Sequence, residues 1–240
     1  MSGHIGVFID GCFADYHISD SRNACHVPDN VSLADAAPLA CAGVTIYRAL
    51  VVADVKEGGW LAIVGAGGGL GHLGVQMGIA KGYNVIAIDA RDEALELCKK
   101  AGAKHILDAR EGKDKIVAKV QELTGAAKGV DATINVSEHE TAAPLSCAIT
   151  KMHGTMVQIS QPVIVNIPFQ ELIFRDIRVV GSLIAGQEQS QAMLDLVGKA
   201  GIKVEVNKFD GLKEVPKMFE LSHSGKMKGK AVCVIDQSQL

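Results

Sequence analysis

A run of glycines between two apolar segments is the part of this sequence whose chemistry is clearest. Residues 64–74 read VGAGGGLGHLG and follow the apolar segment 60–64, and a second apolar segment, 85–88, ends at Asp89. Glycines let a chain turn tightly and approach a pyrophosphate, whose charge then meets the amides that begin the next helix. A carboxylate after the second strand can accept hydrogen bonds from both hydroxyls of a ribose. The spacing therefore predicts a βαβ unit that binds a dinucleotide.

The glycines fit this pattern in more than one register. The strict GxGxxG begins at Gly69 and ends at Gly74, inside the expected helix, whereas two alternative registers end at Gly71. A glycine-rich turn can also be only a tight loop, and an acid in the place of Asp89 can simply begin a helix. The strand before the turn and the helix after it favour the binding interpretation. The cofactor-binding residues predicted in this unit are Gly65, Gly68, Gly69, Leu70, Gly71 and Asp89.

Composition limits the classes of partner. The net charge is −3, 4% of residues are aromatic, and no basic block occurs. These features predict no nucleic-acid partner, because phosphate-backbone binding needs clustered cations and single strands need aromatic platforms. The most apolar region is interrupted by Asp35, Arg48, Asp54 and Lys56, so we also expect no membrane span.

The cysteines and the start of the sequence predict a compartment. Six cysteines are widely spaced with no CxxC pair, and the eight histidines show no metal-ligand spacing. Such a pattern is typical of reduced thiols rather than of a disulfide framework or a closed zinc site. Residues 1–6 lack the basic start and apolar core of a signal peptide. We therefore expect a cytoplasmic protein.

Strand-like and helix-like segments alternate through most of the chain. The expected strands are 60–64, 85–88, 105–107, 130–136, 155–159, 178–184 and 231–235. The expected helices follow the glycine turn and cover 92–101, 113–124, 138–150, 169–176, 190–200 and 215–224. This alternation predicts an α/β fold with a doubly wound parallel sheet.

Several segments, taken in order, resemble one family. Residues 36–50 (AAPLACAGVTIYRAL) together with the glycine run are similar to the zinc-type alcohol dehydrogenases of the medium-chain dehydrogenase/reductase superfamily, and most similar to the yeast-like, fungal branch. Residues 10–16, 27–33 and 223–230 and the pair Gly181-Ser182 fit in the same order. The resemblance implies a Rossmann domain at 43–186 that binds NAD. Residues 1–42 and 187–240 would then be remnants of a GroES-like catalytic domain.

The resemblance also implies that the family's zinc ligands are incomplete here. In the family, a cysteine and a histidine that ligate the catalytic zinc, and a four-cysteine structural lobe, precede the segment with which this sequence starts. Cys41 matches the third ligand. Because a catalytic zinc needs three protein ligands, we expect a truncated catalytic domain without zinc, with Cys41 as a buried thiol beside a helix.

Further site residues are carried over from the family. Thr45, Val136 and Ser137 would border the nicotinamide, and Lys230 replaces the arginine that contacts the pyrophosphate. Asp89 would repel a 2′-phosphate, which favours NAD over NADP. Without zinc, a hydroxyl would have to polarise the substrate carbonyl. The candidate catalytic residues are Thr45, Tyr47 and Ser160.

Three functions remain open at this stage. The first is an NAD-dependent oxidoreductase of the alcohol dehydrogenase type, or a repurposed descendant, acting on a small molecule. The second is a non-redox enzyme, such as an isomerase or cyclase, that uses the opened cofactor cleft. The third is a non-catalytic binding or regulatory protein. In the family, subunits pair through the strand matched by residues 178–184, so a homodimer is expected.

Overall fold

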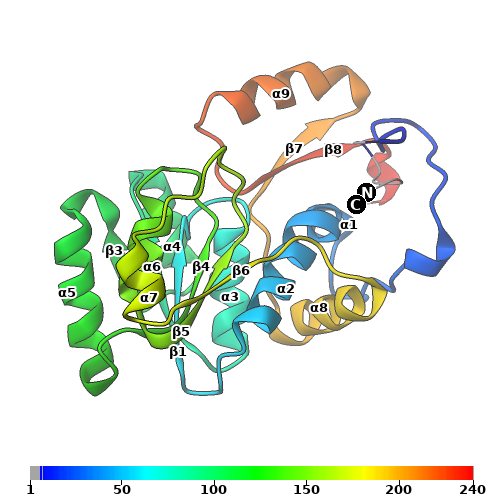
Figure 1. Cartoon of the computed structure of the whole chain (residues 1–240). Helices are drawn as coiled ribbons and strands as arrows, with labels where there is room; N and C mark the ends of the chain where they lie inside the picture. The colour runs from blue at the N-terminus through cyan, green and yellow to red at the C-terminus, as the bar shows by residue number, and fades with distance from the viewer. Residues whose placement is uncertain (1–5, 7, 240) are drawn as a thin grey trace.

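A parallel sheet forms the centre of the computed structural model, which describes residue 6 and residues 8–239 (Figure 1). Its six strands lie in the order β3-β2-β1-β4-β5-β6. Their bounds are β1 Trp60–Val64, β2 Asn84–Asp89, β3 His105–Asp108, β4 Val130–Asn135, β5 Thr150–Gln158 and β6 Arg178–Gly181. The order reverses between β1 and β4, which in such sheets creates a crevice at the carboxyl ends of the strands. The predicted doubly wound parallel fold is confirmed.

Both faces of the sheet are covered by helices. Leu61 and Ile63 of β1 belong to one hydrophobic cluster, whereas Ala62 and Val64 belong to another on the opposite face. Helices α2 (Val44–Ala53), α3 (Gly71–Ala80), α4 (Asp92–Lys100) and α8 (Gln187–Ala200) contribute to the first cluster, and α5 (Lys113–Thr124) and α6 (Ala142–Ile149) to the second. Alternate residues of a strand point to opposite faces, so a strand buried on both sides reads as a continuous apolar run.

Most predicted elements occur with shifted ends. The helix expected at 113–124 has those bounds as α5, while the strand expected at 178–184 ends at Gly181 and α7 is short (Phe169–Ile173). β5 begins at Thr150, earlier than expected, because it continues past a register shift against β4. Element ends are the least certain part of a sequence-based assignment.

One long helical segment was not predicted as such. Helix α1 (Leu33–Pro38), a π-helical turn (Leu39–Gly43) and α2 follow one another without a break. By length and composition alone, Leu33–Ala53 could cross a membrane, although 56% of its most apolar window is buried inside the protein. Because α2 packs on α3, α8, β4 and β5, this segment is a core helix of the fold, and the absence of a membrane span stays a prediction.

The C-terminal part of the chain forms a second, two-stranded sheet. β7 (Val206–Asp210) pairs in parallel with β8 (Lys230–Val234), and α9 (Val215–His223) connects them. Helix α1 contacts both strands, so the N-terminal flank and the C-terminal part lie side by side (Figure 1). The domain limits at 42 and 186 stay a prediction.

Candidate functional site

The glycine turn between β1 and α3 is built where the sequence pattern indicates it. Gly65 has φ +87°, a conformation that side chains other than glycine rarely adopt. A Cβ on Gly71 would lie 2.3 Å from the Gly65 carbonyl oxygen, and one on Gly67 would lie 2.1 Å from the carbonyl oxygen of Ala94. The backbone conformation at position 65 and the lack of room for a Cβ at positions 67 and 71 therefore require glycine. Gly67 was not predicted, because its neighbour Ala94 belongs to the distant helix α4.

Two backbone amides at the start of helix α3 are left without hydrogen-bond acceptors among the described residues. Within the described chain, the N–H groups of Gly69 and Leu70 donate to no acceptor, and no side chain caps the helix. At Gly68 a Cβ would meet only the Gly65 carbonyl oxygen, at 3.3 Å, so little covers this residue. Free amides and the positive end of the helix dipole together favour an anion at this place.

Lys230, the first residue of β8, lies across the same turn. Its Cδ would be 2.6 Å and its Nζ 3.6 Å from a Cβ on Gly69, which places the ammonium beside the start of α3. The Lys230 backbone N–H donates to the carbonyl of Glu205 at 2.7 Å, which fixes the beginning of β8. The structure thus brings a cation from the C-terminal part of the chain to the free amides.

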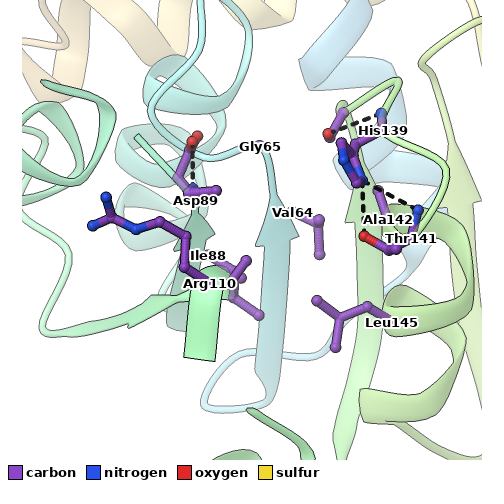
Figure 2. A pocket seen from close by; sticks show the side chains of 12 residues that line it. Val64, Gly65, Ile88, Asp89, Arg110, His139, Thr141, Ala142 and Leu145 are labelled. Atoms are coloured by element: carbon purple, nitrogen blue, oxygen red, sulfur yellow. Dashed lines mark hydrogen bonds between the residues drawn. The ribbon is translucent and has the colours of Figure 1, made fainter. Parts of the chain in front are cut away.

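Asp89 ends β2 and is held by backbone donors. Its Oδ2 accepts from the Gly67 N–H at 2.9 Å and its Oδ1 from the Ala90 N–H at 2.8 Å. The residue is 9% exposed, and its carboxylate lines a cavity of about 240 Å³ (Figure 2). A carboxylate has about four acceptor sites, so Asp89 retains capacity for hydroxyl donors from a ligand.

The cavity beside Asp89 lies between the ends of β1, β2 and β4. Its wall includes Gly65, Asp89, Arg110, Ser137, His139 and Leu145 (Figure 2). The guanidinium of Arg110 is already engaged, because its Nη2 donates to Asp92 at 2.6 Å and to Asp108 at 2.7 Å. The cavity therefore combines apolar walls with one acidic group and no free cation among the described lining residues.

A closed set of side-chain hydrogen bonds occupies the ends of β4 and β5. Asn135 donates to Gln158 (2.9 Å), Gln158 donates to the Ser160 hydroxyl (2.7 Å), and Ser160 donates to the Ser137 carbonyl (2.8 Å). A Cβ on Gly65 would lie 3.1 Å from the Ser137 N, so this network borders the glycine turn. The Ser160 hydroxyl proton is used within the network.

The predicted residues on α2 are placed differently from Ser160. Thr45 is buried near the start of α2. The Lys81 ammonium lies 5.6 Å from the centre of the Tyr47 ring. Lys81 follows the last residue of α3, and a helix of this length extends about 15 Å. Tyr47 is therefore at the end of α3 opposite the glycine turn, and the structure does not bring it to Ser160.

Cys41 differs from the expectation. It is exposed, not buried, because Leu39, Ala42 and Gly43 of the same π-helical turn face the core and leave Cys41 on the other side. Within residue 6 and residues 8–239, no group of three or more His, Cys, Asp or Glu side chains could hold a metal ion. Cys41 therefore does not belong to a set of three such ligands among these residues, the number that a catalytic zinc site takes from the protein.

A family profile and several solved structures match this chain. The family profile described as "Zinc-binding dehydrogenase" matches residues 69–199. The alcohol dehydrogenase of the archaeon Aeropyrum pernix is 30% identical, with a TM-score of 0.84 over 96% of this chain and 67% of that protein.

Two further solved structures are similar to this chain. A cinnamyl alcohol dehydrogenase of Sorghum bicolor is 28% identical, with a TM-score of 0.74 over 87% of this chain and 57% of that one. The acetophenone reductase of Geotrichum candidum, solved with NAD, is 25% identical, with a TM-score of 0.73 over 89% and 59% of the two chains. This chain thus spans between about half and two thirds of the length of the proteins it matches.

Proposed function

Because this chain belongs to the zinc-binding dehydrogenase family, we propose that it binds NAD(H) at the carboxyl edge of its sheet and acts as an alcohol-dehydrogenase-like oxidoreductase. The family assignment gives the oxidoreductase class and the type of cofactor domain. The proposal adds the cofactor, the residues that hold it and the absence of zinc chemistry in this chain. The yeast-like, fungal branch is part of the proposal, on the resemblance of residues 36–50.

One observation carries the proposal: two free amides and an ammonium converge at the start of α3. The N–H groups of Gly69 and Leu70 and the Nζ of Lys230 offer donors of positive character to one small volume. A pyrophosphate presents oxygens that such donors bind. A ribose next to that pyrophosphate would reach Asp89, and Val136 and Ser137 would border the nicotinamide. Bound NAD would supply the acceptor of a hydride.

The choice of NAD over NADP rests on charge in the adenosine cavity. A 2′-phosphate on the ribose would approach the Asp89 carboxylate, which repels it. Arg110 offers little compensation, because Asp92 and Asp108 already occupy its guanidinium. Both features support NAD, with the carboxylate accepting from the free ribose hydroxyls.

A zinc-dependent step is not part of this proposal, since the described residues place no two further metal ligands beside Cys41. Carbonyl polarisation would then depend on a hydroxyl. Ser160 belongs to the network that borders the glycine turn, so it is the best placed of the three candidates. It can donate to a substrate oxygen only by leaving the Ser137 carbonyl. A neutral hydroxyl is also a weaker electrophile than zinc, so we expect slow turnover.

We propose that two copies pair through β6. This strand is the last in the sheet, so one of its edges is unpaired within the described chain. Leu183 and Ile184, directly after it, are 44% and 40% exposed. An unpaired edge beside exposed apolar side chains favours pairing with a second strand.

Titration with NADH and NADPH, followed by fluorescence, tests the proposed function. We expect saturable NADH binding and binding of NADPH at least about tenfold weaker, because Asp89 repels the 2′-phosphate and loses the 2′-hydroxyl as a donor. Elemental analysis for zinc and a turnover assay with and without a chelator accompany the titration. Turnover of ethanol that requires zinc would contradict the zinc-independent part. Product formation without any nucleotide would support a non-redox enzyme instead.

A further inference from the structure

A buried histidine connects the glycine turn to the C-terminal part of the chain. His72 lies in the first turn of α3 and is 1% exposed. Its Nδ1 lies 2.9 Å from the Gly68 carbonyl oxygen, and its Nε2 lies 3.2 Å from the Glu205 backbone N. Since the Glu205 N–H can only donate, Nε2 accepts, and Nδ1 carries the ring proton and donates to Gly68. We call these two hydrogen bonds the His72 bridge.

The His72 bridge ends at the residue that fixes Lys230. The Glu205 backbone N–H donates to the imidazole, and the Glu205 carbonyl accepts from the Lys230 N–H at 2.7 Å. The approach is so close that a Cβ on Gly229 would lie 2.0 Å from the Glu205 carbonyl oxygen. Lys230 then extends over Gly69, one residue from Gly68. Three hydrogen bonds lead from the turn through His72 and Glu205 to Lys230, and the close approach of the Lys230 side chain to Gly69 leads back to the turn.

We propose that His72 is a positioning residue for the dinucleotide: in its neutral form it holds Glu205 and thereby keeps the Lys230 ammonium over the glycine turn. This inference rests on the proposed function, because it concerns the pyrophosphate that Gly69, Leu70 and Lys230 would bind. It adds a pH-dependent control of affinity by a residue that is itself shielded from the ligand. A protonated imidazole would carry a proton on Nε2 and could no longer accept from Glu205.

The charges around His72 favour the neutral form. Burial lowers the pKa of His72, the Gly68 carbonyl and Glu205 raise it by less, and Lys230 and Lys100 lower it further. The net pKa is below the usual 6.5. Lys203, the remaining charged side chain that lines the adjoining cavity, adds no negative charge. The His72 bridge is therefore intact at neutral pH and is lost only as the pH falls through this lowered pKa, which lies below the usual 6.5.

A neighbouring contact keeps the fold in place when the His72 bridge is removed. Gln76, one turn further along α3, donates to the Lys203 carbonyl at 2.8 Å and accepts from the Lys203 N–H at 3.0 Å. This pair attaches the segment before β7 to α3 independently of His72. Substitution of His72 should thus loosen Glu205 and Lys230 without detaching the C-terminal part.

Two substitutions separate the functions of the imidazole. His72→Asn retains a donor near the Gly68 carbonyl but has no acceptor that reaches Glu205, whereas His72→Gln places an amide oxygen near the former Nε2 and does not titrate. His153→Asn is the control, because His153 is exposed and has φ +62°, which asparagine tolerates. Lys230→Met removes the ammonium through which His72 is proposed to act.

The experiment measures NADH affinity by fluorescence at pH 8 and at the lowest pH at which the protein remains folded, with adenosine as a ligand that lacks phosphate. For the wild type and His153→Asn, we expect NADH affinity to fall about tenfold at the lower pH, the value of one hydrogen bond to a charged group. His72→Asn should be about tenfold weaker at both pH values, and His72→Gln near wild type at both. Adenosine binding should not change, and Lys230→Met should abolish the pH dependence.

Several results would overturn the inference. Wild-type NADH affinity at pH 8 in His72→Asn, or an equal fall with pH in wild type and His72→Gln, removes the role of His72 while leaving the proposed function intact. If the wild type binds NADH no better than adenosine, the proposed function fails and this inference fails with it. Should His72→Asn not fold, the pH profiles of the wild type and His72→Gln still decide.

Discussion

Lys230 and Gly69 lie so close that a single methyl group on the glycine would be 2.6 Å from the lysine Cδ. The lysine comes from the start of β8 and the glycine from the turn before α3, far apart in the sequence. Their contact joins the C-terminal part of the chain to the Rossmann unit at the place where a pyrophosphate would bind. Two neighbouring amides, for which the described part of the chain provides no acceptor, complete the arrangement.

Gly69→Ala should weaken dinucleotide binding. The new methyl group would meet the Lys230 side chain and, at 2.8 Å, the Gly229 carbonyl oxygen, so Lys230 must move away from the turn. We expect NADH affinity to fall about tenfold, measured by fluorescence titration. Gly186→Ala is the matched control, because a Cβ there meets nothing within 4 Å. Equal NADH affinity in Gly69→Ala and the wild type would contradict the position of Lys230.

Asp89→Asn should reduce the preference for NADH over NADPH. The amide retains one oxygen for the Gly67 N–H but no longer repels a 2′-phosphate. We expect NADH affinity to fall about tenfold while NADPH affinity is unchanged or rises. Asp131→Asn, at the start of β4 and thus at the opposite edge of the sheet, should leave both affinities unaltered. An unchanged ratio of NADH to NADPH affinity in Asp89→Asn would remove Asp89 from the ribose site.

Asp131 should contribute stability that disappears in acid. Burial alone would raise the pKa of Asp131, but the Lys151 ammonium and the Trp60 N–H together lower it. A lowered carboxyl pKa means that the stabilisation is complete above the unfolded pKa of about 3.9 and is lost as the pH falls through the folded value.

Thermal unfolding of Asp131→Asn checks this. At pH 7 the variant should be about 1–2 kcal/mol less stable than the wild type, at the low end for hydrogen bonds to a charged group because the Asp131 side chain is partly exposed. The difference should shrink as the pH falls below about 3.9. Asp114→Asn, an exposed residue of α5, serves as the control. A difference that persists unchanged in acid would show that the Asp131 charge is not its source.

Ile184→Glu should convert the proposed dimer to a monomer. Ile184 follows the edge strand β6 and is 40% exposed, so a carboxylate there would be buried without a partner in a paired sheet. Light scattering at micromolar concentration should give a dimer for the wild type and for Ile79→Glu, whose isoleucine on α3 is 41% exposed. A wild-type monomer would exclude pairing through β6.

The sheet could be predicted from sequence because its signals are local. The segment Trp60–Val64 is apolar at every position, and its alternate residues enter both hydrophobic clusters. β7 was missed for the opposite reason. Three of the five residues in its sequence VNKFD are polar, and none of the five is buried. The strand is held by pairing with β8, which is distant in sequence. Pairing of that kind left a strand signal in the β8 segment, which was predicted at 231–235, but none in β7.

The site was predicted in part. Gly65, Gly71 and Asp89 could be found because strand, turn and acid follow one another at fixed spacing. Gly67 was missed, since its need for glycine comes from the Ala94 backbone of α4. The exposure of Cys41 was wrong, because which side of the π-helical turn faces the core depends on tertiary packing. Residues required by distant contacts carry no local signal.

A crystal structure of this chain with NADH tests the central claim most directly. The account predicts pyrophosphate oxygens within hydrogen-bond distance of the Gly69 and Leu70 N–H groups and of the Lys230 ammonium, with the adenosine ribose at Asp89. A cofactor bound elsewhere, or a turn that stays empty at saturating NADH, would contradict it.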